Sequence, residues 1–223
     1  IGMSQDGLAS FEPAFADELA VILNWSFDYL QRDKTPKDHS TNLQRDQTGG
    51  SVYLRLTTNP LEQPVRILSS KLKKDIIAGG YWWRTPGPNC ELVIAYQGAV
   101  AEQALAAAGQ LTELRRDIGV LAVTSADRLN EGWNAAKNYR SNDGSKIVSH
   151  VETLLADVPH QALLLTVIDG HPATLSWLAG VKGTRTISHG VNHFGQTGTV
   201  ADLYRHFKLD TNALVEAVIN QSI

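Results

Sequence analysis

Short apolar runs that alternate with helical patterns fill the chain from residue 91 onward. Three of these runs, 92–96, 120–124 and 163–168, are short and largely apolar, as is typical of buried strands. A shorter strand is predicted over 184–188. Apolar residues at helical spacing predict helices over 99–114, 129–139, 149–157, 172–178, 199–207 and 212–220. Strands that alternate with helices predict an α/β fold with three αβα layers and a mostly parallel sheet.

The first 60 residues follow a different pattern. Residues 11–30 place apolar side chains at helical spacing, with Ser10 in position to cap a helix and Pro13 suited to its first turn. Residues 51–58 alternate and include β-branched and aromatic side chains, which predicts a strand. The polar stretch between them, 31–50, is expected to be a solvated loop.

A domain boundary is predicted within residues 61–88. This stretch contains a short helix over 72–78, stopped by two glycines, and then an aromatic run followed by a strong turn signal, TPGPNC. The doublet Trp82–Trp83 is interpreted as a plug between two domains. We therefore predict a first domain over 1–60, a linker over 61–88 and a second domain over 89–223.

Composition excludes several classes of function. The 223 residues carry a formal net charge of −3, which gives no general attraction to nucleic acid or to an acidic membrane surface. No apolar run reaches the roughly 18 residues of a membrane span, and the first residues lack the pattern of a signal peptide. A single cysteine, Cys90, excludes an internal disulfide and favours the cytoplasm. The sequence starts with Ile rather than Met, so a piece of a longer protein is expected.

Polar chemistry concentrates in residues 188–210, a predicted loop followed by a helix that together contain three histidines and three glycines. His189 and His193 lie four residues apart, but their stretch is a loop and no carboxylate stands at a metal-binding spacing, so no metal site is predicted. In the helix that follows, Tyr204, Arg205 and His206 are expected to face outward. Capping and surface solvation explain most such residues; contact with a partner or a second subunit is the sharper hypothesis for these five.

The remaining motifs of catalysis are missing from the sequence. It has no G-x-S-x-G elbow, no phosphate-binding G-x-x-x-x-G-K-[ST] and no G-x-G-x-x-G linked to a strand. Cys90 lies in a turn without an activating neighbour, so a small, semi-buried structural role is expected. We therefore predict no catalytic residue within this chain.

Residues 91–218 nevertheless resemble a known family, the transketolase superfamily of thiamine diphosphate enzymes. The similarity is greatest to the homodimeric E1 component of pyruvate dehydrogenase and its bacterial relatives. The phrase VTSADRLNEGWN is the most discriminating one. The residues that carry the resemblance are ELVIAYQGAVAEQALAAAGQL, VLAVTSADRLNEGWNAA and NHFGQTGTVADLYRHFKLD, with FEPAFADELAVIL and SVYLRLTT upstream.

The resemblance implies a specific architecture and chemistry. Residues 1–60 would be the end of the pyrimidine-binding domain, and the rest a transketolase C-terminal domain. The full-length enzyme would decarboxylate a small 2-oxo acid such as pyruvate and pass the acyl group to a lipoyl-bearing E2 acyltransferase, as a homodimer. Thiamine diphosphate and Mg2+ would be bound by regions outside this chain, because the Gly-Asp-Gly signature is absent. Asp6 matches an acidic residue of the substrate-facing loop and is a candidate substrate contact.

Two alternatives remain open. A transketolase would act on sugar phosphates. Those enzymes resemble this chain at the strand SVYLRLTT, but they have Ser-Arg-Gln shortly after it, where this chain has Thr57-Thr58-Asn59-Pro60. The missing Arg argues against a phosphate ligand. A stand-alone binding or assembly module of the same fold, catalytically silent, is the second alternative.

Overall fold

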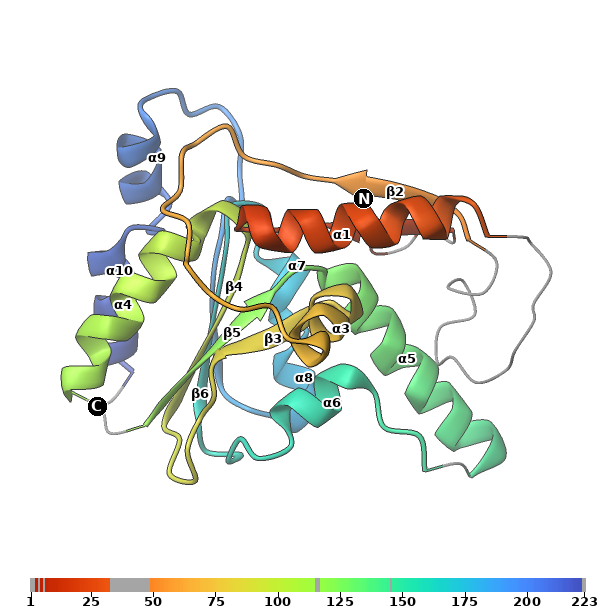
Figure 1. Ribbon diagram of the computed structural model, residues 1–223. Helices are drawn as coiled ribbons and strands as arrows, with labels where there is room; N and C mark the ends of the chain where they lie inside the picture. The colour runs from red at the N-terminus through yellow and green to blue at the C-terminus, as the bar shows by residue number, and fades with distance from the viewer. Residues whose placement is uncertain are drawn as a thin grey trace. The chain divides into compact units, whose positions relative to one another are not determined.

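The computed structural model describes residues 3, 5, 7–32, 49–114, 117–144 and 146–221. The chain divides into two compact units, each built from stretches that lie apart in the sequence (Figure 1). The first unit contains Ile1–Leu56, Gln63–Tyr81 and Val123–Ala156; the second contains Thr57–Glu62, Trp82–Ala122 and Asp157–Ile223. The domain limits predicted at residues 60 and 88 stay a prediction.

The first unit pairs two short parallel strands, β1 (Leu8–Phe11) and β2 (Ser51–Leu54). Its helices are α1 (Ala16–Leu30), α3 (Ser70–Ala78), α5 (Ala126–Asp143) and α6 (His150–Leu155). The prediction of a helix from residue 11, capped by Ser10, is wrong. Ser10 lies in β1 opposite Tyr53, and the helix begins only at Ala16. The Glu18 carboxylate accepts hydrogen bonds from the amides of Ala14 and Phe15, just before the helix.

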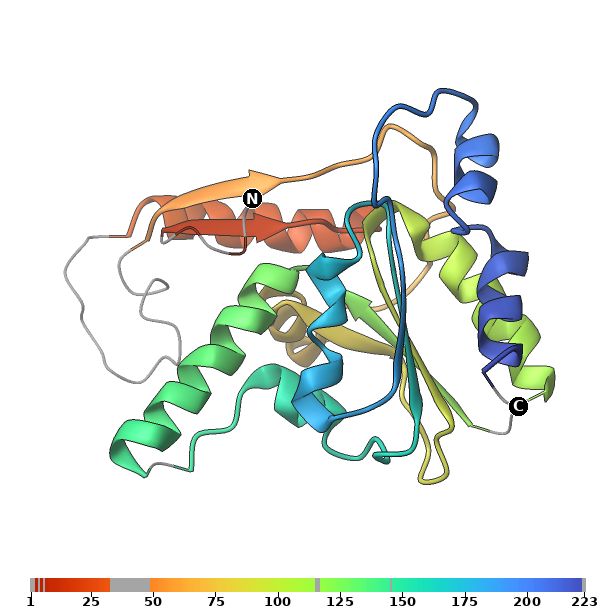
Figure 2. The same cartoon turned by 180° about the vertical axis from the view of Figure 1, so that it is seen from behind.

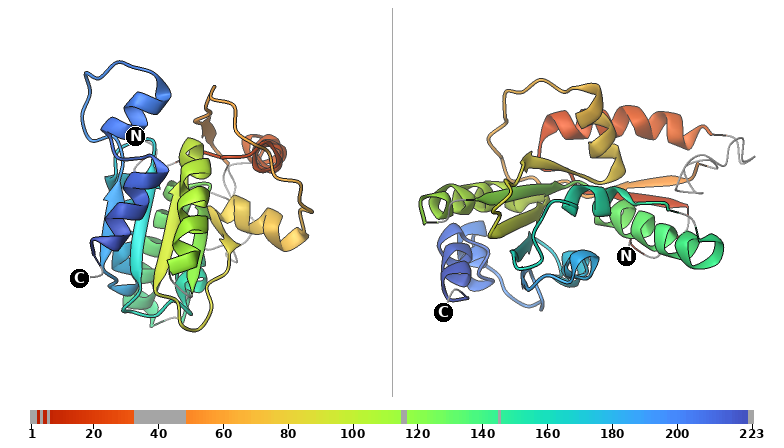
Figure 3. Two further views of the ribbon diagram at one scale, coloured as in Figure 1. Left: turned by 90° about the vertical axis from the view of Figure 1, so that its left-hand side faces the viewer. Right: turned by 90° about the horizontal axis from the view of Figure 1, so that it is seen from below.

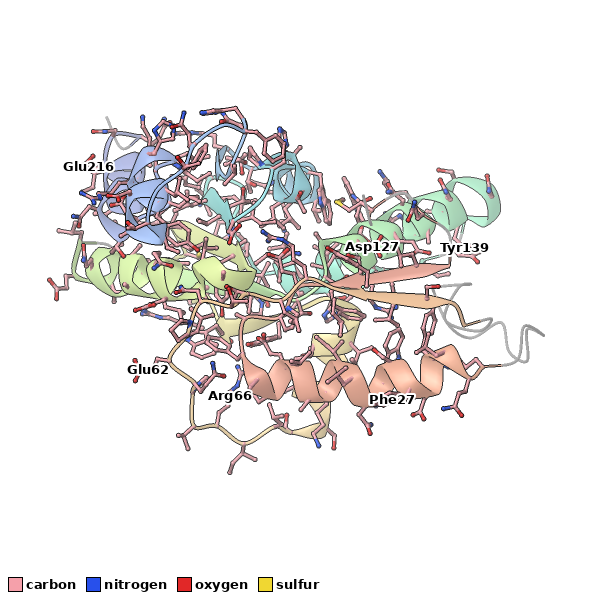
Figure 4. The ribbon with its side chains drawn as sticks, turned by 90° about the horizontal axis from the view of Figure 1, so that it is seen from above. Phe27, Glu62, Arg66, Asp127, Tyr139 and Glu216 are labelled. Atoms are coloured by element: carbon pink, nitrogen blue, oxygen red, sulfur yellow. The ribbon has the colours of Figure 1, made fainter. Side chains whose placement is uncertain are left out.

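Helix α1 buries a different face from the one its leucines suggest. Ile22 and Tyr29 are fully buried, whereas Phe27 is 61% exposed and Leu30 52% exposed. Figure 4 shows Phe27 directed away from the two strands of this unit. The helical period was therefore predicted correctly, but the buried stripe runs through polar Glu18 as well as apolar residues.

Five strands form the main sheet in the order β3-β5-β4-β6-β7. The strands are β3 (Gly80–Arg84), β4 (Leu92–Gln97), β5 (Ile118–Val123), β6 (Leu163–Ile168) and β7 (Thr186–His189). β6 pairs in parallel with β4 on one side and β7 on the other. Every residue of β4, β5 and β6 is buried, as expected for central strands covered on both faces.

Helices of the second unit cover both faces of this sheet (Figures 2 and 3). A 3-10 turn, Gly98–Val100, leads into α4 (Ala101–Leu114), which packs beside α10 (Thr211–Ile219) on one face. The short helices α7 (Ala173–Ser176) and α8 (Ala179–Lys182) lie on the other, and α9 (Val200–His206) follows the loop after β7. The predicted three-layer α/β fold with a mostly parallel sheet is confirmed.

One strand was missed. Trp82 and Trp83 belong to β3, at the edge of the five-stranded sheet, and their interpretation as a plug between two domains stays a prediction. Cys90 is buried, as a small structural residue should be, and its thiol donates to the Leu92 carbonyl at 3.3 Å. No helix in the described ranges is long and apolar enough to cross a membrane.

Candidate functional site

A cavity of about 490 Å3 lies in the second unit, beside the carboxyl ends of β6 and β7. Because β6 and β7 are parallel, the loops that leave them begin at the same edge of the sheet, where ligand sites of open α/β folds gather. The lining is mostly apolar and comes from three segments: Thr57, Thr58, Asn59 and Pro60; Asp169; and Val191, His193, Phe194, Gly195, Gln196, Val200, Leu203, Tyr204, Phe207 and Leu209.

The loop after β7 is fixed against the loop after β6. The Val191 amide donates to the Gly170 carbonyl at 2.7 Å, and a Cβ on Gly190 would lie 2.4 Å from that same oxygen. Only glycine therefore fits at position 190. This close approach sets the start of the stretch that carries His193 to the cavity wall.

Helix α9 supplies another wall, and both of its ends are capped. The Thr199 hydroxyl accepts from the Asp202 amide at 3.2 Å. At the other end, the Leu209 amide donates to the Tyr204 carbonyl at 2.7 Å, while Lys208 adopts φ of 57°. This is a Schellman motif with lysine at the position that usually holds glycine. It turns the chain so that Phe207 and Leu209 both line the cavity.

Residues Thr57 to Pro60 form part of the cavity lining, and their polar side-chain groups are hydroxyls and an amide. The Thr57 Oγ1 accepts from the Asn59 amide at 3.0 Å, an arrangement typical of a local turn. No Lys or Arg stands among the described residues that line the cavity. Its charged or titratable groups are therefore one carboxylate, Asp169, the imidazole of His193 and the phenol of Tyr204.

Two of the predicted histidines meet. The Nε2 atoms of His193 and His206 lie 3.4 Å apart, and their rings are 73° from parallel. The Phe207 ring contacts both, with centroid distances of 5.0 Å and 4.8 Å. The sequence offered no sign of this contact, because the two histidines stand thirteen residues apart on a loop and a helix.

The other predicted residues occupy separate places. Tyr204 lines the cavity, whereas the Arg205 guanidinium is exposed and pairs with Asp202 on the same helix, at 2.6 Å. His189 ends β7, where burial lowers the pKa of its imidazole although a hydrogen bond with the Lys208 backbone acts in the opposite direction. Asp6 lies outside the described residues. Whether these side chains contact a partner stays a prediction.

A larger hollow, of about 740 Å3, lies in the first unit between α1 and α3. Trp25 and Ile77 form part of its lining, with Lys73 and Lys74 beside them. It has one carboxylate, Asp28, and no histidine among its described residues, so it offers no acid–base pair.

The described residues do not fit the metal and diphosphate of thiamine diphosphate. Within them, no group of three or more His, Cys, Asp or Glu side chains is arranged to hold a metal ion. Mg2+ at such a site needs oxygen ligands from carboxylates or carbonyls in addition to the phosphates. This part of the chain provides no such set of carboxylates.

Comparison with known proteins gives structural matches only. No family model matches the sequence, and no curated protein matches it. Among solved structures, transketolase from Pichia stipitis in complex with sedoheptulose 7-phosphate is similar, with 16% identity and a TM-score of 0.60 over 96% of this chain. Transketolase from Leishmania mexicana gives 16% identity and a TM-score of 0.60 over 95%. A split-gene transketolase, an inactive β4 tetramer, gives 15% and 0.57 over 98%.

The chain spans only part of these proteins: 25% of the Pichia chain, 24% of the Leishmania chain and 59% of the split-gene chain. The TM-scores of 0.60 and 0.59 over 96% of the present chain show a common fold at identities of only 16% and 14%. The chain therefore has a transketolase-like fold of the C-terminal-domain type, in which helices flank a mostly parallel five-stranded sheet.

Proposed function

We propose that this chain is the C-terminal part of a thiamine diphosphate-dependent E1 component of a 2-oxo acid dehydrogenase. The full enzyme would decarboxylate a small 2-oxo acid, with pyruvate as the first candidate, and acylate the lipoyl group of an E2 acyltransferase. The cofactor would supply the electron sink, and Mg2+ would hold its diphosphate on residues beyond those described. The transketolase-like fold and the resemblance of VTSADRLNEGWN to this class of enzyme support the proposal.

The observation that carries the choice of substrate is the absence of a cation from the described cavity lining. A sugar phosphate needs a charge partner, and a bidentate arginine is the usual one. The residues that follow β2 and line the cavity are Thr57, Thr58 and Asn59. The nearest arginine along the chain, Arg55, instead forms an ion pair with Glu12 in the first unit. A small 2-oxo acid has no phosphate group, so it does not need such a cation in this lining.

In this proposal the predicted residues serve assembly rather than chemistry. His189, His193, Tyr204, Arg205 and His206 would contact a second subunit of a homodimer or the E2 partner, and Asp6 would contact substrate. The exposed side chains of α9 and of the preceding loop are available for such a contact. The chain would act in the cytoplasm.

A transketolase is the second candidate, and the solved structures favour it. The similar structures are transketolases, and that of Pichia stipitis was determined with a sugar phosphate. In this case the cation for the phosphate would have to come from outside the described cavity lining. A catalytically silent module is a third candidate, supported by the similarity to an inactive β4 tetramer.

The deciding experiment compares two reactions in the cofactor-loaded enzyme that contains this chain. One assay follows pyruvate-dependent reduction of ferricyanide; the other follows two-carbon transfer from xylulose 5-phosphate to ribose 5-phosphate. We expect the first reaction only. Transfer between the sugar phosphates without oxidation of the oxo acid would overturn the E1 assignment in favour of transketolase.

A matched variant sharpens this comparison. Thr58→Arg places a guanidinium in the cavity wall and should strengthen binding of a sugar phosphate, measured by calorimetry, while Thr58→Lys tests charge without the bidentate geometry. Separately, calorimetric titration of the 223-residue chain with thiamine diphosphate and Mg2+ should show no saturable binding. Tight binding would contradict the proposal that the diphosphate is bound by regions outside this chain, and inactivity of the loaded enzyme in both assays would favour the silent module.

A further inference from the structure

The meeting of His193 and His206 has a geometry that a hydrogen bond alone explains poorly. Their Nε2 atoms are 3.4 Å apart, beyond the range of about 2.7–3.2 Å usual for hydrogen bonds from N–H donors. Two imidazole nitrogens that share one tetrahedral Zn2+, each about 2.0–2.1 Å from it, lie about 3.3 Å apart. The observed separation therefore agrees with that of two ligands of one ion.

A neighbouring amide orients one of these rings. The Asn192 Oδ1 lies 2.6 Å from the His193 Nδ1. An amide oxygen only accepts, so the Nδ1 carries the proton and the Nε2 of the neutral ring keeps its lone pair. A hydrogen bond to the second ring nitrogen is the feature that fixes the tautomer of metal-binding histidines. The Nε2 that faces His206 is thus the nitrogen that is free to bind a metal.

The position of His206 is also constrained. It is the last residue of α9, and the Phe207 ring packs edge-on against its imidazole at 4.8 Å. The Schellman turn that follows holds this end of the helix. Both imidazoles are exposed to solvent, so an ion has free access to them.

We propose that His193 and His206 form a two-histidine site for a borderline divalent transition metal ion, such as Zn2+, Cu2+ or Ni2+. Imidazole suits these ions, whereas Mg2+ prefers oxygen. Asp202 is one helical turn before His206, but Arg205 and Thr199 occupy its carboxylate. The described part of the chain therefore supplies two ligands, and water or a ligand from solution completes the coordination. This inference does not depend on the proposed function.

Metal titration of the untagged, metal-free 223-residue chain tests the proposal. We expect one equivalent of Zn2+ to bind by calorimetry, and Cu2+ to give an electron paramagnetic resonance spectrum with nitrogen coupling from two imidazoles. Mg2+ at the same concentration should not bind. His193→Gln and His206→Gln should each lower the Zn2+ affinity at least tenfold.

Matched variants separate this site from casual binding to surface histidines. His160→Gln changes an exposed histidine whose Nδ1 contacts the Lys182 carbonyl, and it should leave the affinity unchanged. Asn192→Ala keeps both imidazoles but loses the orienting oxygen, and it should weaken binding less than loss of a ligand. Failure of the wild type to bind Zn2+, or equal binding by wild type and both glutamine variants with unchanged circular dichroism, would overturn the proposal.

Discussion

A buried carboxylate in the first unit gives the sharpest test of how this fold is held together. Glu18 is 1% exposed, and its Oε1 accepts a hydrogen bond from the Tyr81 hydroxyl at 2.5 Å. The Tyr81 oxygen in turn accepts from Arg66 at 2.7 Å, and Arg66 forms a bidentate pair with Asp17 at 2.6 Å and 2.9 Å. The Tyr81 hydroxyl therefore links the Glu18 carboxylate of α1 to the Arg66 guanidinium and to strand β3.

Tyr81→Phe removes this link without changing the shape of the ring. A hydrogen bond to a charged group contributes about 1.5–3 kcal/mol, and Arg66 Nη2 remains 3.6 Å from Glu18 Oε1 as a weak substitute. We expect the free energy of unfolding to fall by about 1.5–3 kcal/mol, which lowers Tm by about 3–12 °C for a chain of this size. Urea titration followed by tryptophan fluorescence and circular dichroism measures it.

The pH dependence provides a second readout from the same variant. Burial raises the pKa of Glu18, although Tyr81, the amides of Phe15 and Ala14, and Arg66 all oppose the shift. The pKa of Glu18 is higher in the folded protein than in the unfolded chain. Protonation of Glu18 therefore contributes fully to stability below the unfolded pKa, and this contribution is lost as pH rises through the folded pKa. Loss of the hydroxyl raises the folded pKa further, so the cost of Tyr81→Phe should shrink between pH 7 and about pH 4.

The control is Tyr139→Phe, which removes a hydroxyl from a residue that is 41% exposed. It should change the free energy of unfolding by less than about 0.5 kcal/mol. If the two variants are equally stable, or if the cost of Tyr81→Phe grows at acid pH, the assignment of this hydroxyl as a support for the Glu18 carboxylate is wrong.

Two further predictions concern backbone conformation. Gly79 has φ of 111°, and an added Cβ would lie 2.6 Å from the Ser125 carbonyl oxygen, so Gly79→Ala should cost about 2 kcal/mol or more in urea unfolding. The matched change Gly109→Ala, in α4 with open space around it, should instead stabilise by about 0.5–1 kcal/mol, and equal effects of the two would refute the reasoning. Lys208→Gly relieves φ of 57° at the end of α9 and should raise the urea midpoint, by about 0.5–1 kcal/mol in free energy; a lower midpoint would contradict it.

The elements that the sequence predicts best are those whose pattern is local. Residues 163–168 are apolar except for Thr166 and end at Asp169, and the strand occupies that range. Gly79 stops α3 in the left-handed conformation, as the glycine pair indicated. In such places the side chains and the backbone geometry give the same answer, so no distant contact is needed to predict the structure.

The elements that the sequence did not predict depend on contacts with residues far away in the chain. Ser10 looks like a helix cap, but its carbonyl accepts from the Ser125 hydroxyl, 115 residues later, and its strand needs β2 to form. Trp82 and Trp83 gain strand geometry only through β5. Likewise, the role of the five residues named from the sequence stays a prediction, and the contact of His193 with His206 depends on where the loop after β7 docks.

The interleaving of the two units has a consequence for synthesis of the protein. The first unit needs α5 and α6, so it cannot be completed before residue 156 has left the ribosome. Until then the growing chain carries β1 without α5, the helix that contacts it. Until Tyr81 has been made, Glu18 also lacks its hydrogen-bond donor. Products of premature termination in this interval would expose unpaired strands and apolar side chains, and they would be targets for chaperones and proteases.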